Sequence, residues 1–174
     1  MAEDEIGTDA WSAERSAAAD AVRGWLRENE VEFAEERPGV FSFALPGEKK
    51  LQTPVRLDAG THALGVHAFV CRNPDENHAG VHRWLLEKNM RLYAVAFALD
   101  ELGDIYLDAR LPLEMTSAEQ LDTLLGTVLA TADESFNTLL ELGFATSIRK
   151  EWEWRISRGE STANLEAFRG WLES

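Results

Sequence analysis

The segment VFSFALPGEKKLQTPVRLDAGTHALGVHAFVC, residues 40–71, contains three β-strand patterns separated by two short turns. In the first two patterns, apolar residues alternate with polar or small ones, which is typical of strands buried on one face. The third pattern, residues 62–71, is apolar at both parities. It predicts a central strand covered on both sides, or one partly covered by a partner. Strands joined by such short turns pair antiparallel, so the segment predicts an antiparallel sheet.

Three more strand patterns flank this segment. They are VEFAEE at residues 31–36, RLYAVAFAL at 91–99 and DIYLDARLPL at 104–113. The intervening DELGD contains three acids around a glycine, but a calcium loop needs acids at alternating positions over about twelve residues. We therefore expect residues 100–104 to form a hairpin loop between the last two strands.

Helical spacing of apolar residues predicts four helices. The first runs from Thr8 or Asp9 to Asn29, and the second from Asp75 to about Lys88. The third and longest starts at a capping box formed by Thr116 with Glu119, and Gly143 is expected just beyond its end. The segment 149–158 extends or restarts this helix, or forms an edge segment. A short last helix follows Ser161 or Thr162, with three apolar residues inward: Leu165, Phe168 and Leu172.

This order of elements predicts a compact α+β fold in which a mostly antiparallel sheet of about 5–6 strands is packed by helices. We expect a single domain over residues 9–174 with a short C-terminal helix, preceded by a disordered acidic arm at residues 1–8. The chain has a net charge of −14, and residues 1–36 hold 11 acidic and 3 basic side chains. Such acidity argues against nucleic acid and anionic membranes as partners, because both require a basic surface.

The sequence also limits the compartment. Its start lacks the basic and apolar regions of a signal peptide. The longest apolar run, YAVAFAL, is far too short to span a bilayer. The single cysteine, Cys71, lies in an apolar run and allows no disulfide within the chain. We therefore expect a soluble, cytoplasmic protein.

The stretch DENHAGVHRW, residues 75–84, is the first candidate for chemistry. His78 and His82 are four residues apart, so they share one side of a helix, as two metal ligands would. A closed zinc site needs two further ligands, and no HExxH pattern is present. We therefore interpret the stretch as a capped helix start without a metal.

No arrangement of residues predicts catalysis. Tyr106, Asp108 and Arg110 alternate along one strand, which is more typical of a solvated face or a cross-strand ion pair. No phosphate-binding glycine loop, Ser-His-Asp order or nucleophile elbow occurs. We therefore predict neither a catalytic residue nor a cofactor.

The segment RKEWEWRISR, residues 149–158, is locally basic in an acidic chain. If it is helical, Trp152 and Trp154 point about 200° apart and cannot both be buried on one face. A tryptophan beside Arg155 is typical of a binding hot spot. Two interpretations stay open here: the tryptophans pack on the sheet and first helix, or the three residues form a partner or dimer surface.

The chain resembles actinobacterial YbjN-domain proteins over roughly residues 20–160. The most specific motifs are NPDENH (73–78), LLEKN (85–89), ALDELGDIYLDARLPL (98–113) and DESFNTLLELGF (133–144). The resemblance implies a fold like that of type III secretion chaperones, with a helix-covered antiparallel sheet, a homodimer and a role in binding other proteins. It also implies stress or sensory regulation, and it supplies no catalytic residue.

We therefore predict a non-catalytic, chaperone-like or adaptor protein that binds a protein or peptide through an exposed sheet face or edge. The alternative is a small-ligand sensor, with a pocket between sheet and helices near His67, Tyr93 and Tyr106.

Overall fold

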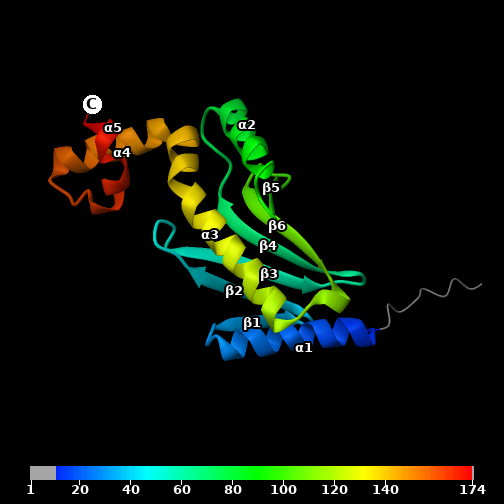
Figure 1. The fold of residues 1–174 in the computed structure, drawn as a ribbon. Coiled ribbons are helices and arrows are strands. Elements are labelled where there is room, and N and C mark those ends of the chain that lie inside the picture. The colour runs from blue at the N-terminus through cyan, green and yellow to red at the C-terminus, as the bar shows by residue number, and fades with distance from the viewer. Residues whose placement is uncertain (1–10, 174) are drawn as a thin grey trace, which may run out of the picture.

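The computed structural model describes residues 11–173. Within this range the chain forms a six-stranded antiparallel sheet, five α-helices and two short 3-10 helices (Figure 1). The α+β class and the antiparallel sheet predicted from the sequence are confirmed. In chain order the elements are α1 (Ala13–Glu28), β1 (Phe33–Arg37), β2 (Val40–Pro46), β3 (Gln52–Ala59), β4 (Ala63–Cys71), α2 (His78–Asn89), β5 (Ala96–Leu99), β6 (Ile105–Pro112), η1 (Leu113–Met115), α3 (Ala118–Gly143), α4 (Ala145–Arg158), η2 (Ala163–Phe168) and α5 (Arg169–Leu172).

The strands are ordered β1-β2-β3-β4-β6-β5, and each pairs antiparallel with its neighbours. The register places Phe41 opposite Leu57 and Leu57 opposite Val66, and all three side chains are fully buried. Their face of the sheet is covered by α1 and α3 (Figure 1). Burying each such side chain stabilises the fold by about 1.5–3 kcal/mol.

The central strand β4 is covered on one side only. Leu64, Val66 and Ala68 are fully buried beneath the helices. On the opposite side Phe69 is half-buried, and the side chain of His67 is 46% exposed. Within residues 11–173 the prediction of a strand covered on both sides is therefore wrong, and cover of the second face by a partner stays a prediction.

The DELGD hairpin between β5 and β6 is confirmed. Gly103 adopts a φ of +83°, which glycine takes without strain. The Asp100 carboxylate accepts the backbone N–H groups of Leu102 and Asp104, both at 2.9 Å. All of these contacts are local, which is why the loop could be recognised from its sequence.

Two helices start later than their sequences suggested. Helix α1 is capped by Ser12, which accepts the N–H of Arg15 at 3.1 Å, and Trp11 lies outside the helix. The predicted acidic arm, residues 1–8, and the predicted helix start at Thr8 or Asp9 lie outside the described residues. Helix α3 is capped by Ser117 rather than by Thr116, because the Thr116 hydroxyl donates to the carbonyl of Pro112.

The start of α2 also differs from the prediction. The residue preceding the helix is Asn77, in the left-handed region with φ +51°, and its side chain makes no cap. Asp75 cannot cap α2 because its carboxylate accepts hydrogen bonds from Arg72 at 2.7 Å and from the Ser147 hydroxyl at 2.8 Å. The DENH stretch therefore contacts the junction of α3 and α4 instead.

Strand β5 begins at Ala96, five residues later than predicted. Ala94 has a φ of +63°, which interrupts the extended run. From the end of α2, the side chain of Asn89 accepts the N–H of Phe97 at 2.7 Å and donates to its carbonyl at 3.1 Å. This amide satisfies backbone groups on the edge strand, which would otherwise attract another strand.

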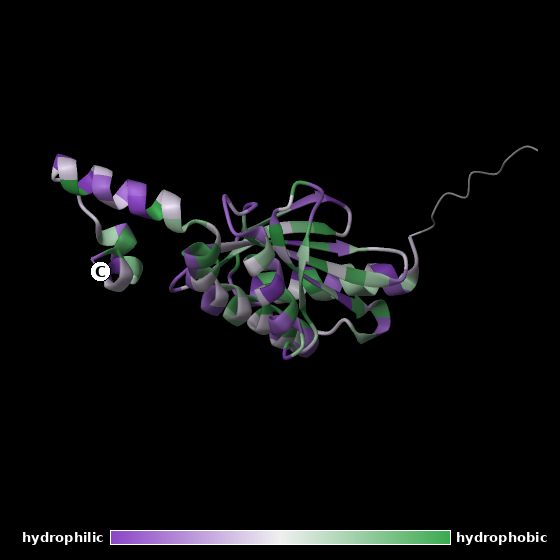
Figure 2. Ribbon diagram, turned by 90° about the horizontal axis from the view of Figure 1, so that it is seen from above, coloured by the Kyte–Doolittle hydropathy of each residue, from purple (hydrophilic) through white to green (hydrophobic). Residues whose placement is uncertain are grey.

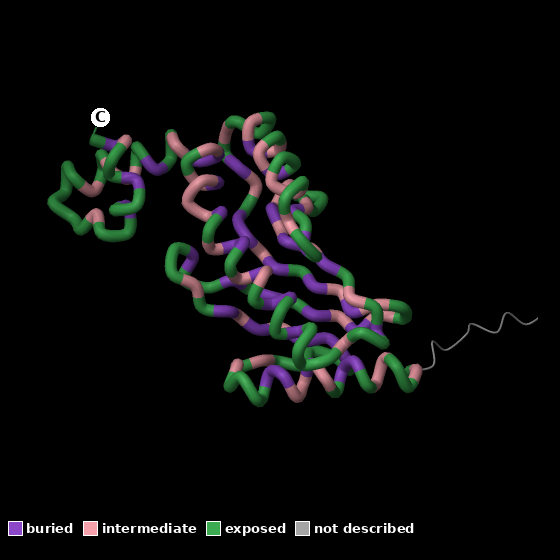
Figure 3. The backbone as a smooth tube through the Cα atoms, viewed as in Figure 1, coloured by how far each residue is buried: buried purple, intermediate pink, exposed green. Residues whose placement is uncertain are grey.

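The segment 149–158, for which the sequence left three possibilities, is helical. Helix α4 restarts directly after α3 and, with η2 and α5, forms a lobe that projects beyond the sheet (Figure 2). Leu165, Phe168 and Leu172 are buried in it, as predicted. Much of its surface is exposed (Figure 3). Gly143 is the last residue of α3 rather than a residue beyond it.

Candidate functional site

The face of the sheet opposite the helices carries a continuous row of polar side chains. Ser42 lies opposite Arg56, Arg56 opposite His67, and His67 opposite Asp108. Because side chains alternate along a strand, these residues share one face. We call this surface the open face, and it consists of Ser42, Pro54, Arg56, His67, Phe69, Tyr106 and Asp108.

Two aromatic rings lie at the centre of the open face. Phe69 and Tyr106 are directly opposite each other on β4 and β6. Their ring centroids are 5.5 Å apart with an interplanar angle of 73°, an edge-to-face arrangement. Burial raises the pKa of the Tyr106 hydroxyl, and Asp100 and Asp104 raise it further. The hydroxyl therefore stays protonated at neutral pH and can donate a hydrogen bond.

Charged groups border the aromatic pair. His67 Nδ1 lies 2.5 Å from Asp108 Oδ1, and both side chains are partly exposed. Arg56 Nη2 lies 3.6 Å from Asp58 Oδ2 on the same strand. The open face therefore combines an apolar centre with a polar border of both signs, which is the usual composition of a protein-binding surface.

A groove of about 670 Å³ runs over this face. All seven open-face residues line it, together with the edge residues Ala98 and Leu99. Its size lies in the range of small-molecule and peptide pockets. Both His67 and Tyr106 from the predicted ligand pocket are in this groove. Tyr93 is outside it and 82% exposed. The pocket they line is on the open face, so the predicted location between sheet and helices is wrong for these residues.

The row Ser42–Arg56–His67–Asp108 contains the residue types of a hydrolase triad but not its geometry. Ser42 is two strands away from His67, or roughly 9–10 Å at the usual strand spacing. Its hydroxyl donates to Glu36 at 2.6 Å. A nucleophile and its base must be within hydrogen-bond reach, about 2.6–3.2 Å. These three side chains therefore do not form a catalytic triad.

The histidines of the DENHAGVHRW stretch lie on one side of α2, with ring centroids 6.3 Å apart. Among residues 11–173, no cluster of three or more His, Cys, Asp or Glu side chains is placed to hold a metal ion. In the same described range, no helix is long and apolar enough to cross a membrane.

Trp152, Trp154 and Arg155 lie on α4, away from the open face. Trp152 packs half-buried against the core, whereas Trp154 is 44% exposed with Arg158 over its ring at 5.2 Å. Arg155 donates to Glu151 at 2.6 Å and to the carbonyl of Ser161 at 2.9 Å. The two tryptophans therefore diverge, as expected of a helix, and Trp154 is the more exposed of the two.

The sequence did not indicate Pro54, Arg56 or Phe69 as members of one surface. Alternation did place Arg56 on the outward side of its strand. The missing information was the register between strands, because a shift by one residue would bring every side chain to the other face.

Comparisons with known proteins agree with this architecture. The sequence profile of the YbjN family, described as "Putative bacterial sensory transduction regulator", matches residues 18–141. A Mycobacterium leprae protein is 56% identical over 124 residues, which cover 71% of this chain and 67% of that protein. A Mycobacterium tuberculosis protein is 47% identical over 152 residues, covering 84% and 83% of the two chains.

Two solved structures share the fold at low sequence identity. One is a chain of the heterodimeric ExoU-SpcU complex from the type III secretion system of Pseudomonas aeruginosa, with a TM-score of 0.51 and 17% identity over 70% of this chain and 97% of that one. The other is a chain of the HopA1-SchA chaperone-effector complex, with a TM-score of 0.55 and 13% identity over 70% and 94%. The fold is thus that of type III secretion chaperones. Because the family profile matches most of its length, this chain belongs to the YbjN family.

Proposed function

We propose that this chain is a non-catalytic, chaperone-like adaptor that binds an extended segment of a partner protein on its open face. The observation that carries the proposal is the groove across β2, β3, β4 and β6, with Phe69 and Tyr106 at its centre. An apolar side chain of the segment packs on these two rings, which supply large contact area at low entropic cost. The two similar structures were solved as complexes of a chaperone fold with a protein, which supports this use of the fold.

Both edges of the sheet are poor sites for adding a strand, and this favours binding across the open face. At β5, Asn89 already occupies the backbone N–H and carbonyl of Phe97. At the opposite edge, β1 presents Glu35 and Glu36, and charges on an edge strand oppose further pairing. Strand addition at either edge is thus disfavoured, and the segment is expected to lie over the groove.

The test uses the two tyrosines of the chain, because only one of them lies in the groove. Peptides are selected from a displayed random library on the intact protein, and the best one is titrated into each variant. We expect Tyr106→Ala to weaken binding about thirtyfold, the effect of an aromatic hot spot of about 2 kcal/mol. Tyr93→Ala is the matched control and should bind as the wild type does. Equal affinities for all three proteins would exclude the open face as the binding site.

We further propose that Trp152, Trp154 and Arg155 on α4 form a partner or dimer surface, with the exposed ring of Trp154 as its most accessible part. We propose that this surface forms the homodimer expected from the family resemblance. A regulatory role in stress or sensing and a cytoplasmic location are further proposals that rest on the same resemblance. Light scattering with in-line mass determination tests the dimer: the mass should be twice 19.5 kDa for the wild type and should fall for Trp154→Ala. A monomeric wild type would contradict this part of the proposal.

A further inference from the structure

A second groove contains a buried cation without a counter-ion. Lys50 follows β2 in the turn before β3, and it is only 8% exposed. Its ammonium donates to the carbonyl of Gln52 at 2.7 Å and lies 5.5 Å from the ring centres of Phe69 and Phe136. Among residues 11–173, no carboxylate lies within ion-pair distance of this ammonium. Burying a charge without a partner is costly, so such a lysine needs an explanation.

The turn that carries Lys50 is held rigidly. One carboxylate oxygen of Asp133 on α3 accepts three consecutive backbone N–H groups, from Glu48, Lys49 and Lys50, at 2.8–2.9 Å. A Cβ added at Gly47 would lie 2.6 Å from the same oxygen, so the close approach requires glycine there. Asp133 thus fixes the backbone from which the Lys50 side chain enters the groove.

The walls of this groove are mostly apolar. It encloses about 460 Å³ between the end of β4, α3 and the lobe. Figure 1 shows these elements converging beside the β2–β3 turn. Seven apolar side chains line it: Phe69, Val70, Phe136, Leu140, Phe144, Ile148 and Leu165.

The other charged groups of the groove are already paired. Arg72 binds Asp75 at 2.7 Å and stacks over the Phe144 ring, with 4.8 Å to its centre. Glu151 binds Arg155 at 2.6 Å. The ammonium of Lys50 is therefore the one uncompensated charge among the described residues that line the groove.

We propose that this groove binds a small carboxylic acid with an apolar body, its carboxylate at Lys50 and its body against the aromatic and aliphatic walls. A carboxylate supplies the missing counter-ion through a charge-assisted hydrogen bond. The apolar walls favour such an acid over an inorganic anion, which would have to be desolvated without apolar contact. Burial lowers the pKa of Lys50, and a bound anion would oppose that effect. This groove shares Phe69 with the open-face groove, but its charge comes from Lys50 and the proposal does not depend on the function of the open face.

The first experiment compares three ligands of the same chain length on the wild-type protein. Decanoate, 1-decanol and decylamine are each titrated by calorimetry. The proposal predicts that decanoate binds at least tenfold more tightly than the alcohol, and that the amine binds more weakly still. A parallel titration with 3-phenylpropionate shows whether the apolar body is preferred as an acyl chain or as an aromatic ring. Equal binding of acid and alcohol, or no binding of either acid, would overturn the proposal.

The second experiment tests the lysine with a matched control on the same turn. Lys50→Met should lower decanoate affinity at least tenfold and bring it to the level of decanol. Lys49→Met removes the same charge from an exposed position and should leave the affinity unchanged. An equal loss in both variants would reveal only a general effect of charge and would contradict the proposal. If Lys50→Met fails to fold, the ligand series on the wild type still decides.

A third experiment uses Cys71 as a reporter of whether the ligand binds in this groove. It is the only cysteine of the chain, it lines this groove, and it is 5% exposed. Burial raises the pKa of its thiol to about 11, so its reaction with iodoacetamide is slow. The reaction is followed over long times at neutral pH, because alkaline pH would also remove the proton of Lys50, whose pKa burial lowers. Saturating decanoate should slow this reaction severalfold, whereas decanoate bound elsewhere would leave the rate unchanged and would contradict the assigned site.

Discussion

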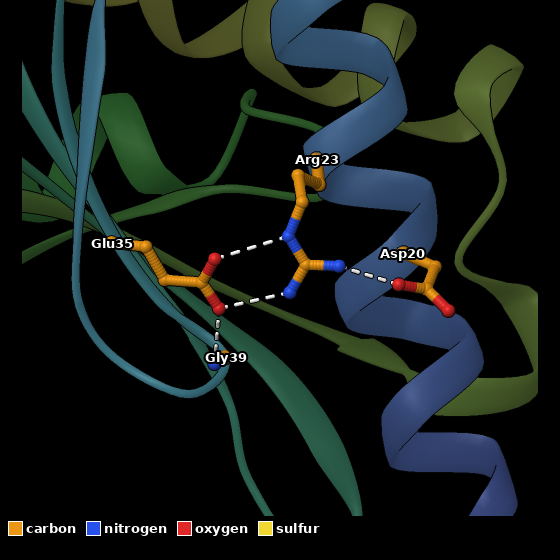
Figure 4. A network of polar contacts seen from close by, with 4 residues as sticks. All are labelled: Asp20, Arg23, Glu35 and Gly39. Carbon is orange, nitrogen blue, oxygen red and sulfur yellow. Dashed lines mark hydrogen bonds and ion pairs between the residues drawn. The ribbon is translucent and has the colours of Figure 1, made fainter.

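Arg23 and Glu35 connect helix α1 to edge strand β1 through a two-point ion pair (Figure 4). Arg23 Nε and Nη2 lie 3.0 and 2.9 Å from the two carboxylate oxygens of Glu35. The same carboxylate accepts the N–H of Gly39 at 3.0 Å, and Asp20 accepts from the remaining arm of Arg23. Arginine suits this role because its planar fork matches a carboxylate.

This ion pair makes stability depend on pH. The hydrogen bonds from Arg23, followed by that from Gly39, lower the pKa of Glu35 below its ordinary 4.5. Its contribution is therefore present above that value and is lost as the pH falls through the lower, folded-state pKa. We expect Glu35→Gln to reduce the unfolding free energy by about 1 kcal/mol at pH 7 and by much less at pH 3. Urea unfolding at both pH values measures this; an equal difference at both would contradict it.

Glu76 fixes the start of α4 from a distant part of the chain. Its carboxylate accepts the N–H of Thr146 at 2.6 Å and the Thr146 hydroxyl at 2.8 Å. An acceptor at this position satisfies a helix N–H that has no partner within the helix. We predict that Glu76→Ala speeds hydrogen exchange in the first turns of α4 about fivefold, the usual loss for a helix cap. Exposed Glu153→Ala, on the same helix, is the control and should not change these rates.

At the scale of elements, Gly143 at the end of α3 packs closely against α2 and the segment that precedes it. A Cβ added there would lie 2.8 Å from Pro74 Cβ and 3.3 Å from Val81 Cγ2. Gly143→Ala should therefore destabilise the protein by about 1–3 kcal/mol, the cost of overpacking. Gly126, on the exposed side of the same helix, has open space around it, so Gly126→Ala should instead stabilise by about 0.5–1 kcal/mol. Thermal unfolding of both variants measures the contrast, and similar shifts would refute the role assigned to Gly143.

The predictable elements are those whose signals are local. The hairpin at Gly103 and the apolar stripe of α3 each depend on residues close in the chain. The errors arose where a distant residue decided the outcome. Asp75 would suit a cap of α2, but Ser147 of α4 donates to its carboxylate. Lys50 was not predicted as a site residue, because nothing local reveals that Asp133, 83 residues away, holds its turn against α3.

At the scale of the whole molecule, all the helices that cover the sheet lie on one side, and this leaves the open face available. Alternation along the strands predicted which side chains point outward. It did not predict which of them gather, because that depends on the register of four strands. His67 on β4 and Tyr106 on β6 line the same groove, whereas Tyr93 lies in a connecting segment. The candidate site was therefore predicted in part.

The most direct measurement of the central claim is a titration of the selected peptide into isotope-labelled protein, followed by the backbone amide resonances. The account predicts that the shifts cluster on β3, β4 and β6 around Arg56, His67 and Tyr106, with little change in α2 or α4. Shifts confined to the lobe, or to strand β1 at the sheet edge, would contradict binding on the open face.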